Sequence, residues 1–141
     1  YEIGTQLKRF QDTGAFLINA GIDNKKTSAT VEVILKELKR IKQTPPSSSE
    51  FLRAKEFYLG QLNLALEDTL DHMLWIGELT SAIDRIYTLQ DILKDIERLK
   101  PSDICRVAAN LFKEKRFNLA LIGPDLEKQK ETIQQLLPAI N

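Results

Sequence analysis

The single histidine, His72, is the side chain of this sequence best suited to bind a catalytic metal. Hydrolytic zinc takes three protein ligands and keeps a fourth position open for water. Met73, Leu74 and Trp75 follow the histidine, so no second ligand lies one helical turn away, and neither H-E-x-x-H nor its inverse H-x-x-E-H occurs. The sequence therefore predicts no metal site and no cofactor in this chain. We interpret His72 as the edge of a helix face shared with Ile76, Leu79 and Ile83.

The single cysteine, Cys105, would need a neighbouring general base to act as a nucleophile. It lies in a helical pattern between Ile104 and Arg106, with no histidine nearby in the sequence. We therefore interpret it as a buried structural thiol. One cysteine also excludes an internal disulfide, a thiolate zinc site and a C-x-x-C redox pair. This favours a reducing compartment such as the cytoplasm, without excluding a periplasm or an organelle.

The remaining charged clusters favour solvated surface over catalysis. Glu67, Asp68 and Asp71 form an acidic group, which we interpret as an exposed helix junction rather than a pair of catalytic carboxylates. The glycines do not take the G-x-G-x-x-G spacing of a phosphate-binding loop. Residue chemistry alone thus predicts no catalytic residues. A small basic patch, interpreted as solvating the turn that follows it, consists of Lys113, Lys115 and Arg116.

Composition and charge indicate a soluble globular chain. Its 141 residues are 43% hydrophobic and 28% charged. Lys+Arg and Asp+Glu number 20 each, so the basic surface of a nucleic-acid-binding protein is not expected. No apolar run approaches the roughly 20 residues of a membrane span, and there is no signal-peptide pattern. The chain opens at Tyr1 inside a strand pattern and without methionine, which suggests a trimmed product whose beginning lies elsewhere.

Alternating and helical patterns predict the elements that must carry these residues. Residues 1–8 alternate apolar and polar side chains, residues 11–14 have turn chemistry, and Phe16, Ile18 and Ala20 share one face of a second strand. We expect an antiparallel hairpin. A short apolar run, residues 117–122, predicts a buried third strand.

Five helices are expected between the hairpin and the third strand, and one after it. The first helix buries one apolar stripe and ends before Pro45-Pro46. Ser47 with Glu50 predicts a capping box for the second helix, whose Gly60 suggests a closely packed neighbour. A third helix is expected over residues 71–83. The first helix is expected to have one apolar face made of Val31, Ile34, Leu35, Leu38 and Ile41, and the second helix runs through Phe51, Leu52, Tyr58, Leu59, Leu62 and Leu66.

The later helices begin at similar signals. Thr88 with Asp91 forms a short capping box, and Pro101 suits the first turn of a helix. Helices between strands must lie on a face of a small antiparallel or mixed sheet, which predicts a single α+β domain, or two-layer α/β domain, over residues 1–141. The apolar stripes of these helices are Leu89, Ile92, Leu93, Ile96 and Leu99, then Ile104, Val107, Ala108 and Leu111, then Ile133, Leu136 and Leu137.

Five short motifs follow one another between residues 14 and 124. Residues 14–23 read G-A-F-L-I-N-A-G-I-D, residues 50–55 read E-F-L-R-A-K, and residues 64–69 read L-A-L-E-D-T. Residues 103–108 read D-I-C-R-V-A, and residues 119–124 read L-A-L-I-G-P. In order and spacing they resemble the pitrilysin and mitochondrial-processing-peptidase family of inverted zinc metallopeptidases, in the C-terminal part of a domain without zinc.

The resemblance implies repeated α/β domains whose two halves close around a peptide. Zinc is then expected in another domain of the parent, on an inverted H-x-x-E-H helix with a distant glutamate, and none in this chain. The opening strand and helix of the domain are absent here, so the domain is expected to be incomplete. The implied partners are a peptide substrate reached through the parent and a companion domain or subunit, with a homodimer as one form.

Tyr1 is the one candidate substrate-binding residue that the resemblance supplies. Some family members place a tyrosine at this position to hold the substrate carbonyl, and a phenol O–H can donate to a developing oxyanion. Packing at the end of a strand is the alternative role for Tyr1.

The resemblance favours a substrate-enclosing, non-zinc portion of a pitrilysin-type zinc metallopeptidase, not catalytic by itself. The alternative is part of a catalytically inactive relative that acts as scaffold or assembly subunit. A third possibility, an unrelated helical adaptor, predicts no hairpin at the start of the chain. The fold alone does not distinguish these three functions. An H-x-x-E-H motif before Tyr1 in the parent protein would favour the peptidase.

Overall fold

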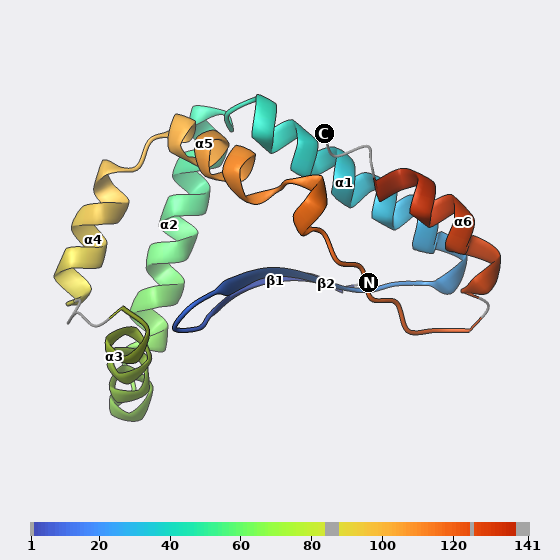
Figure 1. Cartoon of the computed structure of the whole chain (residues 1–141). Helices are drawn as coiled ribbons and strands as arrows, with labels where there is room; N and C mark the ends of the chain where they lie inside the picture. The colour runs from blue at the N-terminus through green and yellow to red at the C-terminus, as the bar shows by residue number, and fades with distance from the viewer. Residues whose placement is uncertain (1, 84–87, 125, 138–141) are drawn as a thin grey trace. The chain divides into compact units, whose positions relative to one another are not determined.

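The fold is known from a computed structural model, which describes residues 2–83, 88–124 and 126–137. Within those residues it has two strands and six α-helices, which confirms the expected α+β class (Figure 1). None of the described helices combines the length and apolar character that a bilayer crossing requires. The elements are β1 (Glu2–Arg9), β2 (Gly14–Gly21), η1 (Asn24–Lys26), α1 (Thr27–Gln43), α2 (Ser48–Ala65), α3 (Thr69–Ile83), α4 (Leu89–Arg98), α5 (Pro101–Leu111), η2 (Glu114–Arg116) and α6 (Glu127–Leu136).

Backbone contacts divide the chain into two compact units. The first unit consists of Tyr1–Gly4, Asn19–Pro46 and Pro101–Asn141. The second unit consists of Thr5–Ile18 and Ser47–Lys100. The base of the hairpin therefore belongs to the first unit and its tip to the second.

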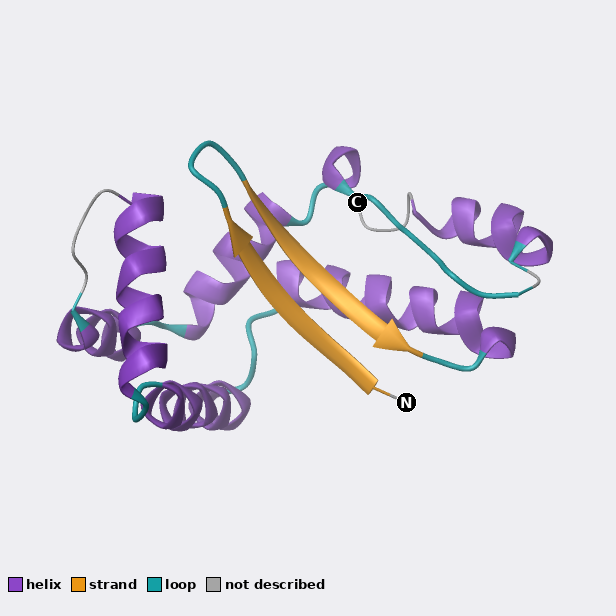
Figure 2. Cartoon of the chain, turned by 90° about the horizontal axis from the view of Figure 1, so that it is seen from below, coloured by secondary structure: helices purple, strands orange, loops and turns teal. Residues whose placement is uncertain are grey.

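The hairpin expected at the start of the chain is confirmed. β1 and β2 pair in a two-stranded sheet (Figure 2), and the N–H of Phe10 donates to the carbonyl of Thr13 at 2.9 Å to close the turn. Every residue of β1 is exposed, and in β2 only Ile18 is half-buried. Phe16 and Ala20, expected on a packed face with Ile18, are exposed. Within the described residues this ribbon is therefore largely exposed, apart from Ile18.

The first unit holds most of the apolar core. α1 packs against α5 and α6, because its stripe of apolar residues turns toward both helices. Leu35 and Leu38 of α1 are buried, as the pattern predicts, whereas Val107 of α5, also expected inside, is exposed. The buried apolar residues of this unit are Val31, Leu35, Leu38, Ala108, Phe112 and Ile133.

Gln129 of α6 connects that helix to the beginning of α1. Its Oε1 accepts from the backbone N–H of Ser28 at 3.3 Å and from the Ser28 hydroxyl at 3.0 Å. Its Nε2 donates to the carbonyl of Asn24 at 2.9 Å. One side chain thus satisfies backbone groups at a helix start, where N–H groups lack partners within the helix.

Replacing Gln129 with leucine is expected to lower the free energy of unfolding of the first unit by about 1–3 kcal/mol, because part-buried polar groups would lose their partners. Denaturant unfolding followed by circular dichroism measures the change. Gln134, exposed on the same helix, provides the control: its change to leucine should stay within about 0.5 kcal/mol. Equal effects at the two positions would contradict this role of Gln129.

The second unit has a thin core. The buried apolar residues Leu62, Leu79 and Ile96 come one each from α2, α3 and α4. Leu52 and Tyr58, which belong to the apolar residues of α2, are exposed.

The helix starts of the second unit follow the sequence signals. Thr88 and Asp91 form the predicted capping box: the Thr88 hydroxyl accepts from the Asp91 N–H, and the Asp91 carboxylate accepts from the Thr88 N–H. Ser47 accepts from the Glu50 N–H at 3.2 Å, which is the first half of the box expected there. The close neighbour predicted at Gly60 is wrong, because a Cβ added there would meet nothing within 4 Å.

The predicted third strand is also wrong. Residues 117–122 form neither helix nor strand, and within the described residues the sheet contains β1 and β2 alone. The Ile122 side chain is fully exposed, at 101%. An extended segment becomes a strand only when a neighbouring backbone exchanges hydrogen bonds with it. The apolar run supplies suitable side chains, but within the described residues it pairs with neither outer edge of the β1–β2 sheet.

Candidate functional site

His72 lies on the inner face of α3, beside Trp75. The histidine is half-buried, and its ring centroid is 5.9 Å from that of Trp75 with the planes inclined by 60°. Leu79, two turns along from His72, is buried. The structure thus places His72 at the predicted helix face, except that Ile76 is exposed and the side chain of Ile83 lies outside the described residues.

Cys105 makes a structural contact within the first unit. Its Sγ donates to the carbonyl of Lys42 at 2.9 Å, which joins α5 to the last turn of α1. The last carbonyls of a helix lack partners within the helix, so the thiol satisfies one of them. The cysteine is half-buried rather than fully buried. This contact agrees with the interpretation of Cys105 as a structural thiol.

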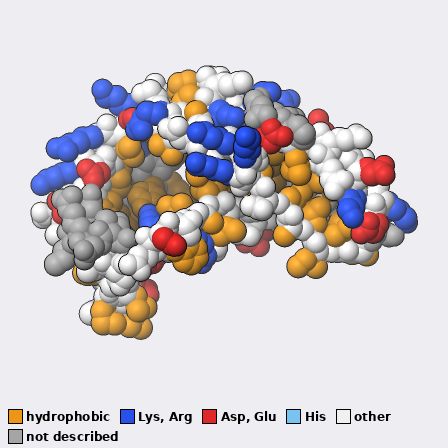
Figure 3. All heavy atoms as spheres, in the orientation of Figure 1, with side chains coloured by type: hydrophobic (Ala, Val, Ile, Leu, Met, Phe, Trp, Pro, Cys, Tyr) orange, Lys and Arg blue, Asp and Glu red, His pale blue; other side chains and the backbone are white. Residues whose placement is uncertain are grey.

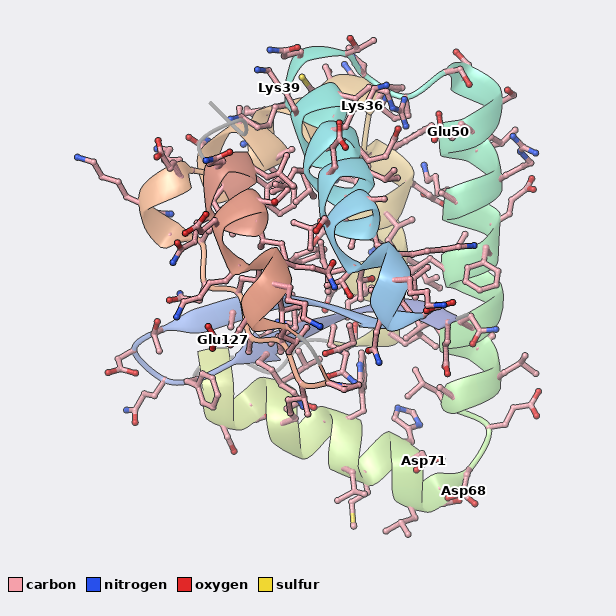
Figure 4. All side chains as sticks on the ribbon, turned by 90° about the vertical axis from the view of Figure 1, so that its right-hand side faces the viewer. Lys36, Lys39, Glu50, Asp68, Asp71 and Glu127 are labelled. Carbon is pink, nitrogen blue, oxygen red and sulfur yellow. The ribbon has the colours of Figure 1, made fainter. Side chains whose placement is uncertain are left out.

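The acidic cluster lies at the junction of α2 and α3. The Asp68 carboxylate accepts from the N–H groups of Leu70 at 2.7 Å and Asp71 at 3.2 Å. Figure 4 shows Asp68 and Asp71 together at the beginning of α3. Glu67 is exposed, like both aspartates. Asp68 therefore caps α3, and the cluster is the solvated helix junction that the sequence predicts.

The basic patch at residues 113–116 is likewise solvated. Lys113, Lys115 and Arg116 are exposed, and Arg116 donates from Nη1 to the carbonyl of Asn110 at 3.4 Å. That bond ties η2 back to α5. Tyr1, the candidate substrate-binding residue, lies outside the described residues.

The side chains present do not fit a catalytic zinc ion. Among the described residues, no group of three or more His, Cys, Asp or Glu side chains is placed to hold a metal. Zinc catalysis needs three such ligands, whereas the chain offers one histidine and one cysteine, and that thiol contacts the Lys42 carbonyl. We assign no zinc chemistry to these residues.

Two comparisons with known proteins bear on the family. Residues 1–58 match the family model described as the Peptidase M16 inactive domain. The chain is also similar to the "Uncharacterized zinc protease YmxG" of Bacillus subtilis (strain 168), with 27% identity over 124 residues. That match covers 88% of this chain and 30% of the relative. The chain therefore spans less than a third of the length of the protein it matches.

The fold and the comparisons first indicate a class: the chain is small and α+β, and it is similar to a part of a peptidase family that is described as inactive. More particularly, both matches support the M16, pitrilysin-like family, and the match of residues 1–58 is to its inactive, C-terminal domain. The resemblance carried by the five motifs is thereby confirmed. A match to a domain described as inactive also agrees with the expectation that this chain holds no zinc.

The purified chain is expected to retain no stoichiometric zinc after dialysis, because it has one histidine and one cysteine and its described residues place no three donors together. Elemental analysis by mass spectrometry measures the metal content. The His72→Ala variant serves as the control and should give the same content as the unchanged chain. One zinc ion per chain, lost on that substitution, would contradict the prediction.

Proposed function

We propose that this chain is a substrate-enclosing, non-zinc portion of a pitrilysin-type zinc metallopeptidase. The observation that carries the proposal is the match of residues 1–58 to the M16 inactive domain. The similarity to a relative named as a zinc protease supports it. Both units then belong to one partial domain, and the zinc ion is held in another domain of the parent.

The proposal gives the chain a binding role rather than a chemical one. A peptide held between two halves of an enzyme is shielded from water and oriented for attack. Tyr1 is the proposed substrate contact in this chain, because a phenol O–H can donate to the oxygen of the bound peptide.

A companion domain or subunit belongs to the same proposal. The supporting observation is the hairpin, which is exposed along most of its length although it carries Ile3 and Leu7, 64% and 52% exposed. Unpaired strand edges and apolar patches favour association with another surface. The companion is either another part of the parent or a second copy of this chain.

Peptidase assays on the parent and on the chain test this function. The full-length parent is expected to cleave an unstructured fluorogenic peptide, and a zinc chelator should abolish that cleavage. The 141-residue chain alone is expected to show none, because its described residues hold no metal group and it has one histidine.

Two outcomes would count against the proposal. Cleavage by the chain alone, abolished by substitutions within it, would give the chain an active site. A full-length parent that has neither zinc nor activity would favour the alternative, a catalytically inactive relative that serves as scaffold or assembly subunit. The sequence before Tyr1 separates these cases directly, since an active parent needs an H-x-x-E-H helix and a downstream glutamate.

A further inference from the structure

An apolar stripe runs along the outer side of α3. Leu70, Met73 and Leu74 are 57%, 59% and 57% exposed, and Gly77 continues the row at the spacing i, i+3, i+4, i+7. A Cβ added to Gly77 would meet nothing within 4 Å, so this end of the row can receive an incoming side chain. We refer to these four residues as the α3 outer surface. Figure 3 shows hydrophobic side chains gathered over α3.

The α3 outer surface lies opposite the face that α3 packs. His72, Trp75 and Leu79 are half-buried or buried, and at 100° per residue they point about half a turn away from Leu70, Met73 and Gly77. α3 is therefore apolar on two sides, whereas its own unit covers one of them. A helix that is apolar on both sides is normally buried on both.

The border of this surface is acidic. Asp71 and Glu78 lie two turns apart on the same side of the stripe, next to Leu74, and both are exposed. Within the described part of the chain neither carboxylate forms an ion pair. The sequence contains no lysine or arginine between Lys55 and Arg85. The negative charge beside the stripe is therefore not balanced by cations on α3 itself.

The combination of apolar stripe and acidic border selects the kind of partner. Anionic lipid and nucleic acid would meet like charge at Asp71 and Glu78. A second copy presenting its own α3 would bring the same carboxylates together, which costs free energy. A protein helix with apolar residues at i, i+3, i+4 and i+7 and lysine or arginine along one border matches both features.

We propose that the α3 outer surface docks an amphipathic, basic helix of a partner protein. Leu70, Met73 and Leu74 supply the apolar contacts, and Gly77 leaves space for a side chain of the partner. Asp71 and Glu78 set the orientation of the docked helix, since its basic border must lie along their side of α3. The surface serves this purpose whether the parent is an active peptidase or a scaffold.

The test uses the whole 141-residue chain and a designed, fluorescein-labelled helical peptide with leucines at the matching spacing and lysines along one border. Fluorescence anisotropy measures its dissociation constant. A peptide with glutamates in place of the lysines is the first control, and it should bind at least about tenfold more weakly, equivalent to roughly 1.4 kcal/mol. Binding of the lysine peptide should weaken as salt is raised, because exposed charges are screened.

Variants of the chain locate the site. Asp71→Lys with Glu78→Lys, and separately Met73→Gln, should each weaken binding of the lysine peptide by about tenfold. Asp95→Lys on α4 and Leu52→Gln on α2 change equally exposed residues elsewhere and should leave binding within about twofold. Thermal unfolding of each variant must match that of the unchanged chain, which is expected because all five positions are exposed.

Three results would overturn the proposal. The first is equally tight binding of the glutamate and lysine peptides, because the acidic border would then have no role. The second is equal binding by the α3 variants and the α2 and α4 controls, because the peptide would then bind elsewhere. The third is self-association of the chain, seen by light scattering and abolished by Met73→Gln, because a second copy would then be the occupant.

Discussion

Replacing Leu35 with alanine is expected to lower the free energy of unfolding of the first unit by about 2–5 kcal/mol. Leu35 is 5% exposed on α1, the helix that packs against both α5 and α6. Removing its side-chain atoms loses their burial and leaves a cavity that rigid neighbouring helices fill only in part. Denaturant unfolding followed by circular dichroism measures the loss.

Val33 provides the matched control for Leu35. It lies two residues away on the same helix, but it is 60% exposed. Val33→Ala should change the free energy of unfolding by no more than about 0.5 kcal/mol. Domains of this size have only about 5–15 kcal/mol of stability in total, so the Leu35 variant should unfold at a clearly lower denaturant concentration. Similar losses in the two variants would mean that α1 does not pack through the face described.

Local signals in the sequence predicted the helices well. Thr88 with Asp91 and Ser47 with Glu50 mark helix starts through hydrogen bonds within four residues, and Pro101 begins α5 as expected. The stripe that contains Leu35 and Leu38 predicted the packed face of α1 because helical spacing brings both side chains to one side. Such features depend on nearby residues alone, which the sequence displays directly.

Features that depend on distant partners were not predictable in the same way. Residues 117–122 have the apolar pattern of a strand, yet a strand forms only by pairing with another backbone, and within the described residues this segment pairs with neither β1 nor β2. Gly60 suggested a close neighbour, but a glycine permits a close approach without producing one. Val107 and Tyr58 have suitable apolar side chains but face solvent, since burial needs a second surface.

The candidate surface on α3 was also missed by motif searching. Catalytic and metal-binding motifs consist of metal ligands and nucleophiles. This surface is instead recognised from exposed apolar side chains that lie beside carboxylates without neighbouring cations. One signal was present in the sequence: no lysine or arginine occurs between Lys55 and Arg85, although basic residues are frequent elsewhere in the chain. Which side of α3 faces outward follows only from the burial of Trp75 and Leu79.

The exposed hairpin gives the second large expected effect, self-association of the chain when no companion is present. β1 and β2 each have one edge without a partner strand in the described residues, and Leu7 of β1 is 52% exposed. Backbone groups at such edges pair readily with another strand. Size-exclusion chromatography with light scattering should therefore show species larger than a monomer, in amounts that rise with concentration.

Two lysine substitutions separate apolar association from a general effect of charge. Leu7→Lys places a charge on the apolar face of β1 and should weaken association by about tenfold. Gln6→Lys adds the same charge to the neighbouring residue, which points to the opposite face, and should weaken association much less. Amide hydrogen exchange should show weak protection of the hairpin edges in the monomeric fraction and stronger protection in the associated one, since opening free energies follow local packing. A stable monomer with protected amides throughout residues 2–21 would mean that the hairpin is already satisfied and needs no companion.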